Sequence, residues 1–587
     1  MKTLFLTAAL AALIPATAAA EEVDEVIVTA TRLPSGVDLV TGARVVDRAE
    51  LEARQTPFAA EVLATIPGVG IARTGPFGGI GAIRIRGATP DKTLVLIDGV
   101  PAGDPADPNG TFDPAFLQLA DIERIEVLSG PQGSLWGSEA IGGVVAFTTR
   151  ELAGWRLEAE AGSFATARGV AAAGHAEEAW ALNGSLAGFR TDGVSKAASG
   201  AEDDAFQTVT ATVGGRWGRF DGRLRYTDAE VEIDGFAPPT FQLGDTADRN
   251  TSRSWSGFGR ATLDGLGFTH RVSLSAYDLV RENLSSFPSR FEADRQVLRW
   301  TAERGPLVLG LERQETHADL SGRAAEDLSV SSAFAVGRTA LGPLTLTASL
   351  RHDDPDRFGA KTTGRLSAAW DLGRGFVATA SAGQGFKIPT ISQVLCDFCF
   401  APPVPLRPEE AEGYDLRLGW RSDRFAAAVT AYRLDVKDQI AYVGLRYVNI
   451  ARTRSEGLEA EADLQLTEGL RLKLAYARTD VVDASTNQSL IRVPDHSGAA
   501  SLFWTGERLA ASVTVRAESS QTDTDVDGFS RVVRDGFAVA DLAASWSVSD
   551  RVSLTARLEN LTDERYSETY GYGEPGRALY VGLRLRN

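Results

Sequence analysis

The sequence predicts an all-β transmembrane barrel of antiparallel strands, with an N-terminal α+β plug domain in its lumen. Three observations predict this fold. The 587-residue chain begins with a secretory signal, continues with a glycine-rich segment of mixed character, and then alternates apolar with polar residues to its end. Residues 1–20, 21–150 and 151–587 are therefore expected to be a signal peptide, a plug domain and a barrel.

Residues 1–20 have the layout of a secretory signal peptide. Lys2 gives a positive start, an apolar run extends over 4–14, and small residues form a cleavage site before Glu21. An anchoring helix is the alternative, but a helix that spans a bilayer needs about 20 apolar residues. The sequence therefore predicts cleavage after Ala20 and export from the cytoplasm.

Residues 21–150 do not alternate and are expected to form a compact domain. Residues 49–66 are helix-like, whereas 94–97 and 122–128 are short apolar runs typical of buried strands. Glycines are dense between 68 and 87, which indicates several tight turns. Because a wide barrel encloses a lumen, a globular domain that precedes one is expected to plug it.

Residues 151–587 carry the barrel pattern. The stretches 344–350, 470–477 and 552–559 each place apolar residues on one face and polar residues on the other. A large soluble β protein with one wet face would look similar, but the signal peptide and the length of the strand region favour a membrane barrel, with outer-membrane lipid against its apolar face. The segment accommodates 22 strands of about 10 residues, and counting alone leaves 18 or 20 strands open.

Composition argues against several function classes. The formal net charge is −18 and the sequence pI is about 4.9, so nucleic acid is not an expected partner. The five histidines are scattered, two cysteines are too few for a closed zinc site, and nothing resembles a hydrolase triad. We therefore expect no enzyme, and a passive pore would not need a whole domain in its lumen.

Several short motifs occur in an order that matches one known family. The strand-like stretch 24–30 is followed by the motifs at 83–87 and 95–100, and later by those at 385–390 and 412–414. Together these segments resemble the TonB-dependent outer-membrane receptors along essentially the whole mature chain. The resemblance implies an outer-membrane protein with TonB as its partner at the periplasmic face. The implied TonB box consists of Asp24, Glu25, Val26, Ile27, Val28, Thr29 and Ala30.

Within this family the chain most resembles the cobalamin transporters, through its short length and the stretch 563–577. The implied function is TonB-dependent active transport of cobalamin (vitamin B12) across the outer membrane. TonB-dependent uptake of an iron-siderophore or other metal complex is the alternative. The outer membrane has no energy source of its own, and the alternating Val26 and Val28 suit strand addition onto a partner that pulls.

The resemblance also implies two sites. The ligand is expected to meet the apical loops of the plug, although a glycine-rich loop also arises from turn chemistry alone. The expected ligand contacts are Ile80, Ala82, Thr89, Asp107 and Pro108. Calcium, a structural cofactor, suits a set of carboxylates on two extracellular loops, and a solvated acidic loop is the alternative reading. These carboxylates are Asp192, Glu202, Asp204, Asp234 and Asp245.

Two further features complete the sequence predictions. Cys396 and Cys399 are close in sequence, and outside the cytoplasm a local disulfide between them is expected. The chain ends on Asn587, whereas barrels of this family usually end on an aromatic residue. This departure bears on the efficiency of barrel assembly and not on the fold.

Overall fold

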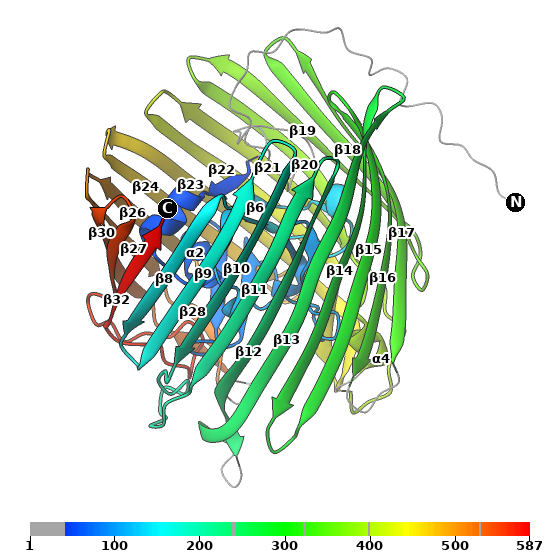
Figure 1. The fold of residues 1–587 in the computed structure, drawn as a ribbon. Coiled ribbons are helices and arrows are strands. Elements are labelled where there is room, and N and C mark those ends of the chain that lie inside the picture. Colours follow the sequence, from blue (N-terminus) through cyan, green and yellow to red (C-terminus); the bar gives the residue numbers. More distant parts are fainter. Residues whose placement is uncertain (1–41, 238–241, 321–324, 397–398, 527–529) are drawn as a thin grey trace, which may run out of the picture.

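The computed structural model describes residues 42–237, 242–320, 325–396, 399–526 and 530–587. The signal peptide and the TonB box predicted from the sequence lie outside the described residues. Within them, the chain forms a closed antiparallel barrel of 22 spanning strands around an N-terminal plug (Figure 1). The predicted fold class is confirmed, and the strand count that arithmetic left open is 22.

The plug is a mixed α/β domain. Its main sheet has the strand order β1-β6-β7-β4-β5, in which β4 and β7 pair in parallel, and the β2–β3 hairpin forms a separate two-stranded sheet. One face of each sheet contributes to a common apolar core that includes Ile83, Ile85 and Val145. The elements are β1 (Arg44–Val46), α1 (Arg48–Arg54), α2 (Ala59–Leu63), β2 (Val69–Arg73), β3 (Gly81–Ile85), η2 (Pro90–Lys92), β4 (Thr93–Ile97), β5 (Val100–Pro101), η3 (Pro114–Phe116), β6 (Ile122–Ser129), α3 (Gly133–Trp136) and β7 (Gly143–Thr149).

The barrel follows the plug and closes when its last strand, β32, pairs with its first, β8. Its spanning strands are β8 (Gly154–Gly162), β9 (Thr166–Ala176), β10 (Trp180–Thr191), β11 (Phe206–Trp217), β12 (Phe220–Ala237), β13 (Gln242–Gly265), β14 (Phe268–Leu284), β15 (Ser289–Arg304), β16 (Leu307–Leu320), β17 (Glu326–Leu341), β18 (Leu344–Pro355), β19 (Lys361–Gly373), β20 (Phe376–Lys387), β21 (Glu409–Arg421), β22 (Phe425–Val443), β23 (Arg446–Thr467), β24 (Leu470–Asp483), β26 (His496–Thr505), β27 (Leu509–Glu518), β30 (Phe537–Ser549), β31 (Val552–Glu559) and β32 (Ala578–Arg586). The loops add β25 (Gln488–Ser489), β28 (Gln521–Thr524), β29 (Arg531–Arg534) and α4 (Ile391–Leu395).

The two ends of the barrel differ. Short turns such as 218–219 and 550–551 join strands at one end, whereas long connections such as 192–205, 388–408 and 560–577 lie at the other. Short turns face the periplasm and long loops face the outside in outer-membrane barrels. The end with α4 and β28, toward the bottom of Figure 1, is therefore extracellular.

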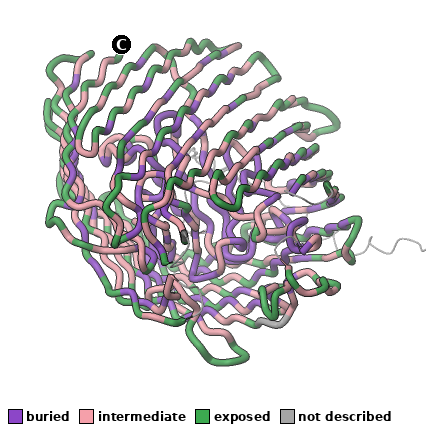
Figure 2. The backbone as a smooth tube through the Cα atoms, turned by 90° about the horizontal axis from the view of Figure 1, so that it is seen from below, coloured by how far each residue is buried: buried purple, intermediate pink, exposed green. Residues whose placement is uncertain are grey.

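The alternation in the sequence sorts side chains between lipid and lumen. In β24, Leu474 and Tyr476 are exposed on the outer face, whereas Lys473 points inward and its Nζ lies 2.6 Å from Glu50 of the plug. Figure 2 shows the same division across the described residues, with buried residues gathered inside the ring of strands. No helix among the described residues is long and apolar enough to cross a bilayer.

The C-terminus seals the barrel seam. Leu579, Val581 and Leu583 are exposed on the outer face of β32, as their parity predicts. The Asn587 side chain accepts a hydrogen bond from the Trp155 backbone N–H at 2.6 Å. The terminal residue that departs from the aromatic pattern thus contacts the start of β8.

Candidate ligand vestibule and plug interface

The apical loops of the plug face the extracellular end of the barrel. Ile80 ends the loop between β2 and β3 and is 50% exposed, and Ala82 is half-buried on β3. Thr89 precedes η2, and its hydroxyl accepts a weak hydrogen bond from Gln439 Nε2 at 3.4 Å. Asp107 lies in a separate loop after β5. These residues therefore belong to two loops and one hairpin at the same end of the plug.

Asp107 and Pro108 have internal roles in that second loop. The Asp107 carboxylate accepts hydrogen bonds from the Asn109 backbone N–H at 2.8 Å and from the Thr111 hydroxyl at 3.2 Å. The Pro108 carbonyl accepts one from the Thr390 hydroxyl at 3.0 Å. Thr390 also caps α4, so this part of the apical surface is tied to the β20–β21 loop.

Three of the five candidate calcium ligands come together. One carboxylate oxygen from each of Glu202, Asp204 and Asp234 lies within 4.8 Å of the others. Asp192 and Asp245 lie outside this carboxylate trio. Asp192 is exposed, and Asp245 instead accepts hydrogen bonds from the backbone N–H groups of Ala201 and Glu202, in the β10–β11 loop.

The carboxylate trio has the properties of a hard-cation site. Asp204 and Asp234 are buried, and burial together with the nearby Asp234 charge raises the pKa of the Asp204 carboxyl to about 6. Asp234 Oδ1 is buried without a hydrogen-bond partner among the described residues, which leaves a lone pair available. Calcium takes such oxygen ligands from flexible loops, so these donors fit the ion.

The β10–β11 loop, which carries Glu202 and Asp204 of the trio, contacts two other regions. Its Lys196 packs over Gly75 of the plug, where an added Cβ would lie 2.7 Å from Lys196 Cγ, and Gly75 has φ +87°. The backbone of the same loop bonds to the β31–β32 loop, with the Ala198 N–H donating to the Gly571 carbonyl at 2.9 Å. The conformation of the loop around Glu202 and Asp204 is thereby linked to the plug and to the β31–β32 loop, the last extracellular loop.

The β31–β32 loop folds into the lumen and is held by charge. Arg73, at the end of β2, contacts Glu61 of the plug at 2.7 Å, and Glu568 and Glu574 of this loop at 2.9 and 3.2 Å. Arg516 of β27 also pairs with Glu568, at 2.8 Å. Burial, together with the neighbouring Glu568 carboxylate, raises the pKa of the Glu574 carboxyl to about 8. The sequence analysis missed this cluster.

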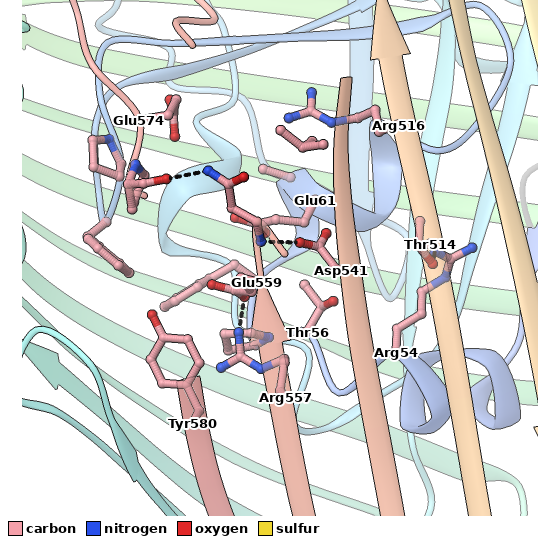
Figure 3. Close-up of a pocket in the computed structure, with 18 of the residues that line it drawn as sticks. Arg54, Thr56, Glu61, Thr514, Arg516, Asp541, Arg557, Glu559, Glu574 and Tyr580 are labelled. Atoms are coloured by element: carbon pink, nitrogen blue, oxygen red, sulfur yellow. Dashed lines mark hydrogen bonds and ion pairs between the residues drawn. The ribbon is translucent and has the colours of Figure 1, made fainter. Parts of the chain in front are cut away.

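A cavity of about 130 Å³ lies beside the cluster, between the plug and strands β27–β32 (Figure 3). Figure 3 shows Arg557 directed at Glu559, and the Asn560 backbone N–H donates to Asp541 at 2.9 Å. On the plug side, Arg54 donates to the Thr514 hydroxyl at 2.9 Å. A second cavity, of about 190 Å³, adjoins it along β21–β26, and Arg54 and Thr65 line both.

Buried ion pairs join the plug to the same side of the barrel. Glu459 of β23 binds Arg86 at 2.9 and 3.1 Å and Arg44 at 2.6 Å, and its side chain is 1% exposed. Arg86 pairs in addition with Asp415 of β21. We call β23–β32, with its ion pairs and cavities, the polar wall.

The opposite side of the plug combines ion pairs with apolar contacts. Among its ion pairs are Asp121 with Arg225 of β12 at 2.8 Å and Asp91 with Lys387 of β20 at 2.8 Å. Phe58 of the plug packs against Phe189 and Phe206 of the barrel, with ring centroids 5.0 and 5.7 Å away. The other buried apolar clusters that join plug and barrel use strands between β9 and β22, and within the described residues none of them uses β23–β32. We call β9–β22 the apolar wall. In the described structure, buried apolar clusters with the plug are therefore confined to the apolar wall, whereas ion pairs with the plug occur on both walls.

Cys396 and Cys399 are joined by a disulfide, with Cα atoms 5.1 Å apart. Cys396 ends α4 in a left-handed conformation, at φ 55°. The disulfide closes the turn after α4 in the long β20–β21 loop. This loop is the one that contacts Pro108 through Thr390.

Two family models match the chain. The model described as "TonB dependent receptor-like, beta-barrel" matches residues 179–561, and the "TonB-dependent Receptor Plug Domain" model matches residues 37–144. The two matched segments follow the division between barrel strands and plug described above.

Solved structures share the fold over nearly the whole chain. The siderophore receptor PirA from Acinetobacter baumannii is 16% identical with a TM-score of 0.79, and the match covers 96% of this chain and 100% of that one. A ferric enterobactin receptor (PfeA) mutant from Pseudomonas aeruginosa, in complex with enterobactin, is 18% identical with a TM-score of 0.77, covering 93% and 99%. The ferric yersiniabactin uptake receptor FyuA from Yersinia pestis is 17% identical with a TM-score of 0.75, covering 94% and 98%. At these identities the likeness concerns the fold.

Proposed function

Because the chain belongs to the TonB-dependent receptor family, we propose that it imports a ferric siderophore across the outer membrane with energy delivered through TonB. The family consists of transporters and receptors and not of enzymes, and its barrels reside in the outer membrane. The proposal concerns the ligand, since TonB-dependent transport follows from the family itself.

The observation that carries the ligand class is the full-length match to siderophore receptors. The similar solved structures are named as receptors for ferric enterobactin, ferric yersiniabactin and another siderophore. They support the reading that the sequence analysis held as its alternative. Cobalamin remains the second candidate, because the carboxylate trio Glu202, Asp204 and Asp234 corresponds to part of the site implied by resemblance to cobalamin transporters.

Direct binding separates the two candidates. Purified protein in detergent would be titrated with ferric enterobactin, ferric yersiniabactin and cyanocobalamin, with and without calcium. We expect saturable binding of at least one ferric chelate and none of cyanocobalamin. Binding of cyanocobalamin, with no binding of any ferric chelate, would contradict the siderophore proposal and favour cobalamin as the ligand.

Energy coupling is assigned to the TonB box, which lies outside the described residues. Val28→Pro removes a backbone N–H and fixes φ, so strand pairing with TonB should fail while ligand binding at the outer face persists. Val28→Ala keeps the backbone donor and is the matched control. Uptake by the proline variant at the wild-type rate would contradict this assignment.

Calcium at the carboxylate trio is the cofactor that the proposal includes. Asp204 and Asp234 would hold the ion from buried positions, and Glu202 would complete the trio from the exposed side. A bound dication would offset the repulsion among the three carboxylates and order the loop that packs on Gly75 and on the β31–β32 loop. Ordered loops lower the entropy lost when a ligand binds, so calcium should raise ligand affinity.

A further inference from the structure

The barrel wall is notched at its extracellular end, between β19 and β20. Pairing between these two strands stops at Arg365 and Gly383, although each strand extends several residues farther toward the outside. One side chain bridges the opening, because Gln384 Oε1 accepts a hydrogen bond from the Gly364 backbone N–H at 3.3 Å. Strand ends that are not paired with each other leave backbone donors and acceptors available to another molecule.

A cavity of about 110 Å³ lies in this notch. Phe386 lines it and is only 1% exposed, because the ring also belongs to the interior apolar cluster with Leu328 and Val330. The polar lining comes from four neighbouring strands, β19–β22, and carries charges of both signs. Among these residues are Lys361, Thr363, Gln384, Glu410, Glu412 and Lys437.

The cavity lies on the lipid face of the barrel. The strand register places Glu410 of β21 beside Lys437 of β22, and both side chains are exposed. Glu410 has the same parity along β21 as Tyr414 and Leu416, which are exposed on the outer face. Because β20 leads into the loop with α4, this end is extracellular. The cavity is therefore set at the level of the lipid headgroups of the outer leaflet.

A strip of small side chains continues from the cavity toward the centre of the membrane. The outward residues of β20 next to the notch are Ala378, Ala380 and Ala382, which we call the alanine strip. It extends over about 14 Å, at about 3.4 Å per residue. Larger exposed side chains flank it in register on both neighbouring strands. They are Leu366 and Trp370 of β19, and Tyr414, Leu416 and Leu418 of β21.

From this arrangement we infer that the notch and the alanine strip bind one molecule of a phosphorylated glycolipid of the outer leaflet. The sugar headgroup occupies the cavity, and an acyl chain lies along the alanine strip between the flanking leucines. This inference goes beyond transport and does not depend on which ligand is imported, since it concerns the outside of the barrel.

The chemistry of the cavity supports a sugar that carries phosphate. Sugar hydroxyls both donate and accept hydrogen bonds, so they can satisfy the carboxylates of Glu410 and Glu412 together with the amide of Gln384. Thr363 adds a hydroxyl that is buried without a hydrogen-bond partner among the described residues. Lys437 is exposed and forms no ion pair with any described residue, so its ammonium can bind a phosphate.

Tyr414 lies where the headgroup and the acyl chain would meet. Its hydroxyl donates to Glu412 Oε2 at 3.3 Å, whereas its ring is exposed beside the alanine strip. An aromatic ring with one polar end is typical of the boundary between headgroups and hydrocarbon. A glycerophospholipid would bring a phosphate but few hydroxyls, and would leave the carboxylates and the amide of the cavity without partners.

Direct lipid binding tests the headgroup half of the site. Purified protein, stripped of lipid in detergent, would be titrated with fluorescent deep-rough lipopolysaccharide, in which lipid A carries a short sugar core. Wild type should bind it saturably, with one molecule per chain. Lys437→Gln should weaken binding about 10-fold, the lower end for a hydrogen bond to a charged group. Arg313→Gln, at an exposed outward position of β16, is the matched control and should leave the affinity unchanged.

A second pair of variants tests the alanine strip. Ala380→Leu places a larger side chain in the strip and should weaken binding of the same lipopolysaccharide. Ala431→Leu is the matched control, because Ala431 is exposed on the outer face of β22 and lies on the far side of Leu416. Its affinity should equal that of wild type.

Other occupants would give different results. Unlabelled phosphatidylethanolamine should not displace the labelled lipopolysaccharide at equal concentration, and displacement with equal affinity would assign the site to a glycerophospholipid. A lipid-free dimer that Ala380→Leu converts to a monomer would assign the alanine strip to a second copy of the chain. Either result overturns the inference. So does the absence of saturable binding by wild type, or full affinity in Lys437→Gln or in Ala380→Leu.

Discussion

Replacing one buried carboxylate should loosen the plug without disturbing the barrel. Glu459 of β23 accepts two hydrogen bonds from Arg86 and one from Arg44, and it is almost completely buried. Glu459→Gln keeps the shape of the side chain and removes its charge. The barrel strand loses no backbone hydrogen bond, so the effect should be confined to the plug interface.

The size of the stability loss depends on the carboxylate partners that Arg44 and Arg86 retain in Glu459→Gln. Breaking a buried pair by removing one partner costs about 3–5 kcal/mol. Arg44 retains Glu461 at 3.3 Å, and Arg86 retains Asp415, so neither guanidinium is left fully unpaired. We therefore expect Glu459→Gln to lower the free energy of plug unfolding by about 3 kcal/mol, at the lower end of that range.

A fluorophore can follow the plug alone. Glu123 is exposed on the plug, and the native cysteines are joined in a disulfide, so a thiol dye can be placed on Glu123→Cys. Urea unfolding followed by this dye would report the plug. Glu461→Gln is the matched control; Glu461 is 25% exposed, and its loss should cost about 1 kcal/mol. Equal unfolding midpoints for Glu459→Gln and wild type would refute the reasoning.

Three further predictions address the loops and the two walls. Because burial raises the pKa of Glu574, the folded loop keeps a proton that the free side chain loses near pH 4.5; stability should therefore fall as pH rises from about 5 to about 8, and melting curves of Glu574→Gln should lack that fall. The hydroxyls of Ser134 and Ser349 lie 2.6 Å apart across the apolar wall, so Ser134→Cys with Ser349→Cys should form a disulfide. Oxidised protein should still import ligand if the plug stays on that wall, and uptake that returns only with reductant would contradict this. Asp204→Ala with Asp234→Ala should abolish the calcium effect on ligand affinity, and wild-type affinities that are equal in calcium and in excess chelator would exclude the coupling.

The barrel could be predicted well from the sequence because the alternation of apolar and polar residues is a local pattern within each strand. Alternation in 470–477 and 552–559 reflects a strand with lipid on one side, and no long-range knowledge is needed to read it. The strand count is different, since a turn and a short strand use similar numbers of residues. Only closure, with β32 paired to β8, fixes the number at 22.

The site was only partly accessible to sequence reasoning. The sequence grouped five acidic residues, but their spacing could not show that Glu202, Asp204 and Asp234 converge while Asp192 and Asp245 do not. Convergence depends on how the β10–β11 loop folds against the extracellular end of β12, which carries Asp234. The Arg73 cluster was missed for the same reason, because its partners Glu568 and Glu574 come from the opposite end of the chain.

One pattern in the sequence did indicate that charged barrel residues bind partners on the plug. In the stretch 458–464, leucine and alanine alternate with Glu459, Glu461 and Asp463, so three acidic residues share the inward face. Charges on the inner face of a barrel strand that surrounds a plug require partners on that plug. Arg44 and Arg86 supply those partners for Glu459. Acidic residues at the inward-facing positions of this strand would therefore have indicated the polar wall.

The polar wall also explains how a pull from the periplasm can reach the ligand face. Arg44, in β1 near the start of the described plug, forms an ion pair with Glu459 of the barrel. Its partner Glu459 also holds Arg86, which directly follows β3, the strand that carries the predicted ligand contact Ala82. Broken ion pairs beside a cavity can be rehydrated, whereas separating the phenylalanines of the apolar wall would expose apolar surface. The apolar wall adds buried apolar clusters to its ion pairs, so force on the N-terminal segment should release the polar wall first. Glu459 connects that release to β3 through Arg86.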